Sequence, residues 1–114
     1  MTVTEKTKNK ITILRLSGNL MGEEHGTTIL NMVNNHINNG IIHFAIDLSD
    51  VKYMNSSGIG VLISILTKAR NRSGDMAVIK PSEHIQKLLL ITKLNKIFKI
   101  ANTENEALEL LSKK

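Results

Sequence analysis

Strand-like and helix-like patterns alternate along this chain, and this alternation constrains the fold more than any other feature. Short apolar runs bounded by turn residues predict strands at 10–16, 20–21, 41–48, 76–79 and 96–100. Apolar residues at three- and four-residue spacing predict helices at 24–38, after the Ser56–Ser57–Gly58 turn, after Ser82 and after Thr103. Helices separate most of the predicted strands, and the loops between strands and helices are too short to let the chain return as a hairpin. A largely parallel sheet with right-handed crossovers is therefore expected. We therefore predict an α/β fold, with a mixed, mostly parallel sheet of four to five strands and about four helices.

The length and composition predict one domain over residues 1–114. Hydrophobic residues make up 41% of the chain, and the only aromatic ones are Phe44, Tyr53 and Phe98, so the core must be aliphatic. Residues 1–9 are polar and are expected to be an N-terminal extension. No apolar run reaches the roughly 18 residues of a membrane span. We expect a cytoplasmic protein without membrane insertion.

The net charge of +5 does not by itself predict nucleic-acid binding. The basic residues are scattered over the chain, whereas a nucleic-acid site gathers them on one face beside aromatic or bidentate readers. We expect no nucleic-acid partner.

The segment 47–60, D-L-S-D-V-K-Y-M-N-S-S-G-I-G, carries the clearest functional signal. It sets Ser56, Ser57 and Gly58 between an apolar strand and an amphipathic helix. The start of a helix has unpaired N–H groups and a partial positive charge, which favour an anion or a phosphate added to a hydroxyl. Sites in folds of this class lie beyond the carboxyl ends of strands, which is where this segment falls. The pattern indicates phosphate chemistry.

Structural explanations compete with that interpretation. A serine before a helix most often caps it, and two serines would allow one to cap and the other to remain free. Asp47 at a strand end most simply caps a loop through backbone hydrogen bonds. The sequence contains no phosphate-binding loop, dinucleotide fingerprint, nucleophile elbow or histidine pair at metal-ligand spacing. We expect neither catalysis nor a bound metal or cofactor.

The chain resembles the STAS domain family, and more specifically the bacterial anti-sigma factor antagonists. The segment D-L-S-D-V-K-Y-M-N-S-S-G-I-G-V-L, the preceding L-S-G-N-L and the later G-D-M-A-V-I and P-S-E-H-I-Q-K-L-L carry the resemblance. It extends from about Lys10 to Leu111.

The resemblance implies a non-enzymatic switch protein. Ser56 occupies the position of the family's phosphoacceptor. Such a protein binds a serine kinase that is also an anti-sigma factor, and phosphorylation with ATP and magnesium breaks the complex until a PP2C-type phosphatase resets it. The residues expected to bind the partner or line the site are Leu20, Met21, Asp47, Asn55, Ser57, Gly58 and Ile59.

Two positions depart from the family pattern. Asn55 stands where an aspartate usually precedes the phosphoacceptor, and Met21 stands where another aspartate is common. Both changes remove negative charge beside Ser56. Two alternatives therefore stay open: a constitutive interaction module for a transporter complex or signalling scaffold, and a nucleotide- or anion-binding module.

Overall fold

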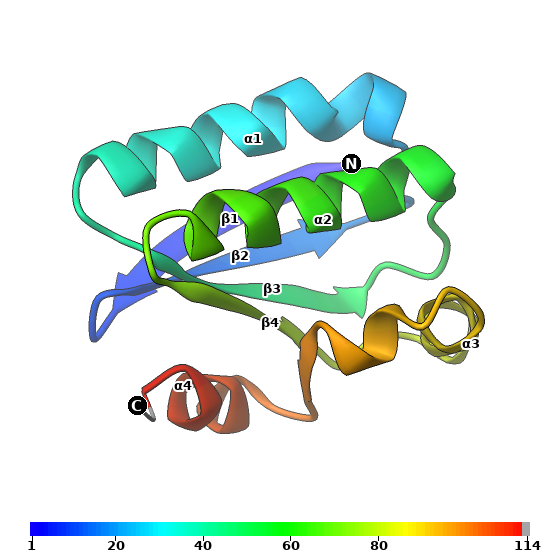
Figure 1. Ribbon diagram of the computed structural model, residues 1–114. Helices are drawn as coiled ribbons and strands as arrows, with labels where there is room; N and C mark the ends of the chain where they lie inside the picture. The colour runs from blue at the N-terminus through cyan, green and yellow to red at the C-terminus, as the bar shows by residue number, and fades with distance from the viewer. Residues whose placement is uncertain (113–114) are drawn as a thin grey trace.

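Five strands form one sheet in which every strand lies beside its neighbour in the chain (Figure 1). The computed structural model describes residues 1–112, apart from the side chains of Gly22 and Glu23. β1 is antiparallel to β2, and the other pairs are parallel. The strands are β1 (Thr2–Lys8), β2 (Ile11–Ser17), β3 (His43–Asp50), β4 (Asp75–Ile79) and β5 (Lys99–Ala101). The helices are α1 (Gly22–Asn38), α2 (Ser56–Arg70), α3 (Glu83–Ile91) and α4 (Glu104–Ser112), with a 3-10 turn, η1, at Leu94–Lys96. The predicted α/β fold is confirmed.

Strand β1 corrects the expectation for residues 1–9. They form an edge strand and a hairpin with β2, in which Thr2 faces Ser17 and Lys8 faces Ile11. The turn uses Asn9 and Lys10, both with positive φ (54° and 64°). Because β1 is mostly exposed, it lacks the apolar alternation that identifies a half-buried strand. The turn also lacks the Asn-Gly pair that usually marks a tight hairpin.

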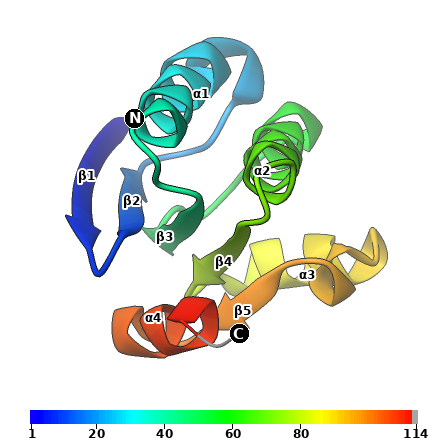
Figure 2. The ribbon, with the colours of Figure 1, turned by 60° about the vertical axis from the view of Figure 1, so that its left-hand side comes forward.

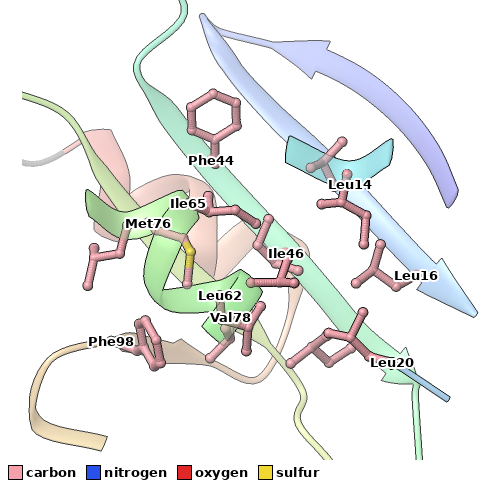
Figure 3. Close-up of a cluster of buried hydrophobic side chains, with 14 of the residues drawn as sticks. Leu14, Leu16, Leu20, Phe44, Ile46, Leu62, Ile65, Met76, Val78 and Phe98 are labelled. Carbon is pink, nitrogen blue, oxygen red and sulfur yellow. The ribbon is translucent and has the colours of Figure 1, made fainter. Parts of the chain in front are cut away.

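Helices cover both faces of the sheet. α1 and α2 lie side by side over one face, α4 packs on the other, and α3 and η1 lie near the β5 edge (Figures 1 and 2). Under α1 and α2 lies the larger core cluster, which includes Leu14, Leu16, Phe44, Ile46, Leu62, Ile65, Met76 and Val78 (Figure 3). The smaller cluster, against α4, consists of Ile11, Ile13, Ala45, Ala77, Ile79, Ala101, Ala107 and Leu111. Successive strand residues point to opposite faces, so each central strand feeds both clusters.

The loop after β3 places the start of α2 at the carboxyl edge of the sheet. The Gly18 N–H donates to the Asp50 carbonyl at 3.2 Å, and the Leu20 N–H donates to the Tyr53 carbonyl at 3.0 Å. Leu20 and Met54 then form an isolated parallel bridge. The strand predicted at 20–21 is thus a single bridge beyond β2. These bonds fix the loop that leads into α2.

Asp75 joins the end of α2 to β4 and β5. Its carboxylate lies 2.9 Å from the Lys99 Nζ and 3.7 Å from the Arg70 Nε, and it accepts from the Met76 N–H at 2.8 Å. Burial alone would raise the pKa of Asp75. The bonds from Lys99 and the Met76 N–H and the charges of Lys99 and Arg70 outweigh burial and hold that pKa below its ordinary value.

Replacing Asp75 with asparagine should lower the free energy of unfolding by about 1 kcal/mol at neutral pH. Because the pKa of Asp75 is lower in the folded than in the unfolded chain, its stabilisation is complete above the unfolded pKa near 4. It declines as the pH falls through the lower folded value. Urea unfolding of both proteins across this range measures the effect. A difference that stays constant down to about pH 3 would contradict the ion-pair assignment.

Candidate functional site

Helix α2 begins at Ser56, and its cap is Asn55. Asn55 has an extended backbone (φ −93°, ψ −178°), and its Oδ1 accepts a hydrogen bond from the Gly58 N–H at 2.8 Å. An N-cap side chain that reaches the third helical N–H satisfies one of the unpaired donors at the helix start. Both Ser56 and Ser57 are exposed. The expectation that one serine caps the helix is corrected, because the residue before them does so.

Gly58 permits a close contact between α2 and the segment before α1. A Cβ atom at this position would lie 2.5 Å from the Leu20 carbonyl oxygen and 3.2 Å from the Met54 Cβ. Gly60 differs, because a Cβ there would meet nothing within 4 Å. The first glycine is therefore required by packing, and the second leaves open space on α2.

The predicted site residues fall into an exposed group and a supporting group. Leu20, Gly58 and Ile59 are buried, with Ile59 only 8% exposed. Met21 and Asn55 are half-buried. The buried residues therefore position Ser56 and Ser57 and have little surface to offer a partner.

The starts of α1 and α2 are brought together. Met21 precedes α1, and its carbonyl accepts from the Glu24 and His25 N–H groups at 3.1 and 3.0 Å. The neighbouring Leu20 carbonyl accepts from the Asn55 N–H at 3.4 Å. The first turn of α2 contains no acidic residue. The positive ends of two helices thus lie near the exposed serines.

Asp47 lies apart from the serines, on the other side of the sheet. On β3 it shares a face with Ala45, which packs against α4, and its neighbour across the register is Arg15 of β2. Its Oδ1 accepts from the Ser49 N–H at 2.9 Å and from the Ser49 hydroxyl at 2.7 Å. Both residues lie within β3, so the Asp47 carboxylate makes a local contact near the end of this strand and caps no loop. It does not join the group around Ser56.

Two rings that the sequence did not single out stand on the same edge of the sheet. Tyr53, 43% exposed, stacks on His84 of α3 with ring centroids 5.2 Å apart. The Ser82 hydroxyl caps α3 through the Ile85 N–H and donates to the Lys52 carbonyl at 3.2 Å. Ser82 was predictable as a cap, but its tie to the loop before α2 was not. Together these contacts brace that loop from the α3 side.

A shallow groove runs between α1 and α2, starting beside the serines. Its volume is about 430 Å³, and Ser57, Gly60 and Ser64 line one side of it. Gly26 and Leu30 line the other. The open space at Gly60 contributes to this groove.

Comparison with known proteins decides the family. The family model for the STAS domain matches residues 2–107. The chain belongs to the STAS domain family. In the described part of the chain, no helix is long and apolar enough to cross a membrane, and no group of three or more metal-binding side chains is present.

Several relatives have names that describe an anti-sigma factor antagonist. A Paenibacillus polymyxa protein named anti-sigma F factor antagonist is 31% identical over 103 residues, which cover 86% of this chain and 84% of that protein. A Thermotoga neapolitana protein with the provisional name anti-sigma factor antagonist is 37% identical over 73 residues, covering 64% of this chain and 65% of its own length. A Thermotoga maritima structure with the same provisional name has a TM-score of 0.89 at 28% identity, covering 97% of this chain and 95% of that one.

Gly58→Ala should destabilise the protein by about 1–3 kcal/mol, because the new methyl group would press on the Leu20 backbone. Gly60→Ala is the matched control in the same turn. It should be neutral or stabilising by up to about 1 kcal/mol, since alanine favours a helix over glycine and meets no neighbour there. Thermal or urea unfolding measures both. Equal effects of the two changes would refute the packing role of Gly58.

Proposed function

We propose that this protein is a non-catalytic, cytoplasmic anti-sigma factor antagonist that works by partner switching. With Ser56 unphosphorylated, it binds a serine kinase that also acts as an anti-sigma factor, and phosphorylation of Ser56 releases it. A PP2C-type phosphatase resets the switch. The observation that carries the proposal is the exposed Ser56 at the first position of α2, in a helix whose cap is supplied by Asn55. The names of the family relatives support the antagonist role.

The position of Ser56 suits a switch that leaves the fold intact. A phosphate there would add about 1.5 to 2 negative charges at neutral pH. The helix start stabilises negative charge, and α2 has no acidic residue in its first turn to oppose it. The free phosphoprotein therefore remains folded. In a complex, the same charge would lie within an interface, where an unpaired buried charge costs several kcal/mol.

The two departures from the family pattern remove charge but keep geometry. Asparagine caps a helix about as well as aspartate does, so Asn55 presents Ser56 with the same backbone. Met21 adds half-buried apolar surface beside it. In this proposal the kinase supplies the groups that bind magnesium and take the proton from the Ser56 hydroxyl, without help from a carboxylate at position 21 or 55.

Incubation with the cognate kinase and ATP should place one phosphate on Ser56. Mass spectrometry of the wild type, Ser56→Ala and Ser57→Ala measures this. Ser57 is the matched control because it is the adjacent exposed serine. We expect no phosphate on Ser56→Ala and full labelling of Ser57→Ala. Labelling that persists in Ser56→Ala would contradict the assignment.

Ser56→Asp should weaken binding to the same kinase at least tenfold, because it places a charge in the interface. Ser56→Asn is the uncharged control of similar size and should bind more tightly than Ser56→Asp. Calorimetry without ATP separates the two. Equal affinities would show that charge does not drive release.

The constitutive module remains the second candidate, favoured by the missing carboxylates at Met21 and Asn55. It would bind a transporter complex or scaffold regardless of Ser56, so wild type and Ser56→Ala would capture the same partner equally in cells. A nucleotide- or anion-binding module would give heat on titration with nucleotides. Either result would favour the corresponding module over the phosphorylation switch.

A further inference from the structure

We propose that the segment from the end of α3 to β5 is a peripheral docking surface for an anionic lipid membrane. The surface consists of four aliphatic side chains and three lysines: Leu90, Ile91, Ile97, Ile100, Lys87, Lys93 and Lys96. We refer to it as the α3–β5 patch. It does not include Ser56 and stands independently of the partner switch.

The α3–β5 patch gathers most of the large exposed aliphatic surface of the described residues. Ile91 is 77% exposed and Leu90 is 64% exposed, which are the highest values among the large hydrophobic side chains of the described residues. Ile97 and Ile100 are 41% and 37% exposed. Leu90 and Ile100 line one shallow hollow of about 340 Å³ together with Lys87, so α3 and β5 meet on one surface there. Exposed apolar patches of this kind mark interaction sites.

The fold holds this apolar surface in place at the edge of the molecule. Figure 2 shows α3 and the segment that follows it standing out from the sheet, away from α1. The Ile97 carbonyl accepts a hydrogen bond from the Arg70 guanidinium at 3.2 Å, which ties the turn to the end of α2. Phe98 is buried in the core beneath it. The exposed side chains are thus presented on an anchored turn.

The charge around the patch is positive. Lys87, Lys93 and Lys96 are exposed and form none of the ion pairs seen among the described residues, whereas Lys99 is held by Asp75. Glu83 is the acidic residue that lines the same hollow. The three lysines therefore leave an excess of positive charge, which attracts an acidic surface and repels a second copy of the same patch.

The side-chain types favour a lipid surface over a protein groove. Centres of protein interfaces are depleted in lysine, and leucine is under-represented among their hot spots. The seven residues of the patch are only leucine, isoleucine and lysine. Aliphatic side chains beside lysines match segments that lie at the headgroup level of anionic membranes, without a spanning helix.

Vesicle co-sedimentation of the full chain tests this. We expect binding to vesicles of phosphatidylcholine mixed with phosphatidylglycerol, little binding to phosphatidylcholine alone, and weaker binding at high salt. The double variant Leu90→Ser and Ile91→Ser should lose at least tenfold in binding. Its control is Ile63→Ser, which removes an isoleucine that is 40% exposed on α2.

The lysines have their own matched control. The pair Lys93→Gln and Lys96→Gln should weaken vesicle binding about fivefold per lysine. The pair Lys8→Gln and Lys10→Gln removes the same charge from the β1–β2 hairpin, and Lys10 shares the positive φ of Lys93. This control should retain most of the binding. A thermal unfolding midpoint for each variant verifies that it is folded.

Three results would overturn the proposal. The first is no sedimentation with phosphatidylglycerol vesicles, or equal sedimentation with neutral ones. The second is equal loss in the patch variants and their controls. The third is self-association of the wild type in sedimentation velocity that Leu90→Ser with Ile91→Ser abolishes, which would make the patch an interface between copies. The patch variants should still be phosphorylated on Ser56 by the kinase. Measuring this phosphorylation therefore separates a failure of the membrane proposal from a failure of the switch.

Discussion

The contact between the first turn of α2 and the Leu20–Met54 bridge determines how this protein presents its exposed serines. Gly58 lets the helix approach the Leu20 carbonyl, and the Asn55 side chain satisfies the Gly58 N–H from outside the helix. Both interactions act on one residue, Gly58. The helix start is thereby fixed without using the hydroxyl of Ser56. Because the Ser56 hydroxyl is not needed to cap the helix, its modification would leave the helix start intact.

This arrangement separates two properties that a single aspartate combines in the family pattern. Capping requires an oxygen acceptor at position 55, and asparagine supplies it. Charge beside the hydroxyl requires a carboxylate, and Asn55 and Met21 supply none. The geometry of presentation is therefore preserved while the local electrostatics differ. In the proposed switch, the kinase would act on a serine whose helix start is more positive than the family pattern provides.

The sequence predicted the alternating architecture and the position of the two serines at the start of a helix, because both leave local signals. The elements it missed lack such signals. β1 is an exposed edge strand, so no apolar period marks it. Asp47 follows an apolar run buried on both faces, where periodicity does not tell which face a residue takes. The tight contact at Gly58 joins segments more than thirty residues apart in sequence. Tertiary contacts of this kind cannot be obtained from local pattern alone.

The most direct test of this account is the amide hydrogen exchange rate of Gly58, measured by NMR in the wild type, Asn55→Ala, Asn55→Asp and Ser56→Ala. Loss of a cap worth about 1 kcal/mol should speed exchange about fivefold in Asn55→Ala. Asn55→Asp and Ser56→Ala should exchange at nearly the wild-type rate. Faster exchange in Ser56→Ala, with no change in Asn55→Ala, would show that the serine holds the helix start and would contradict the account.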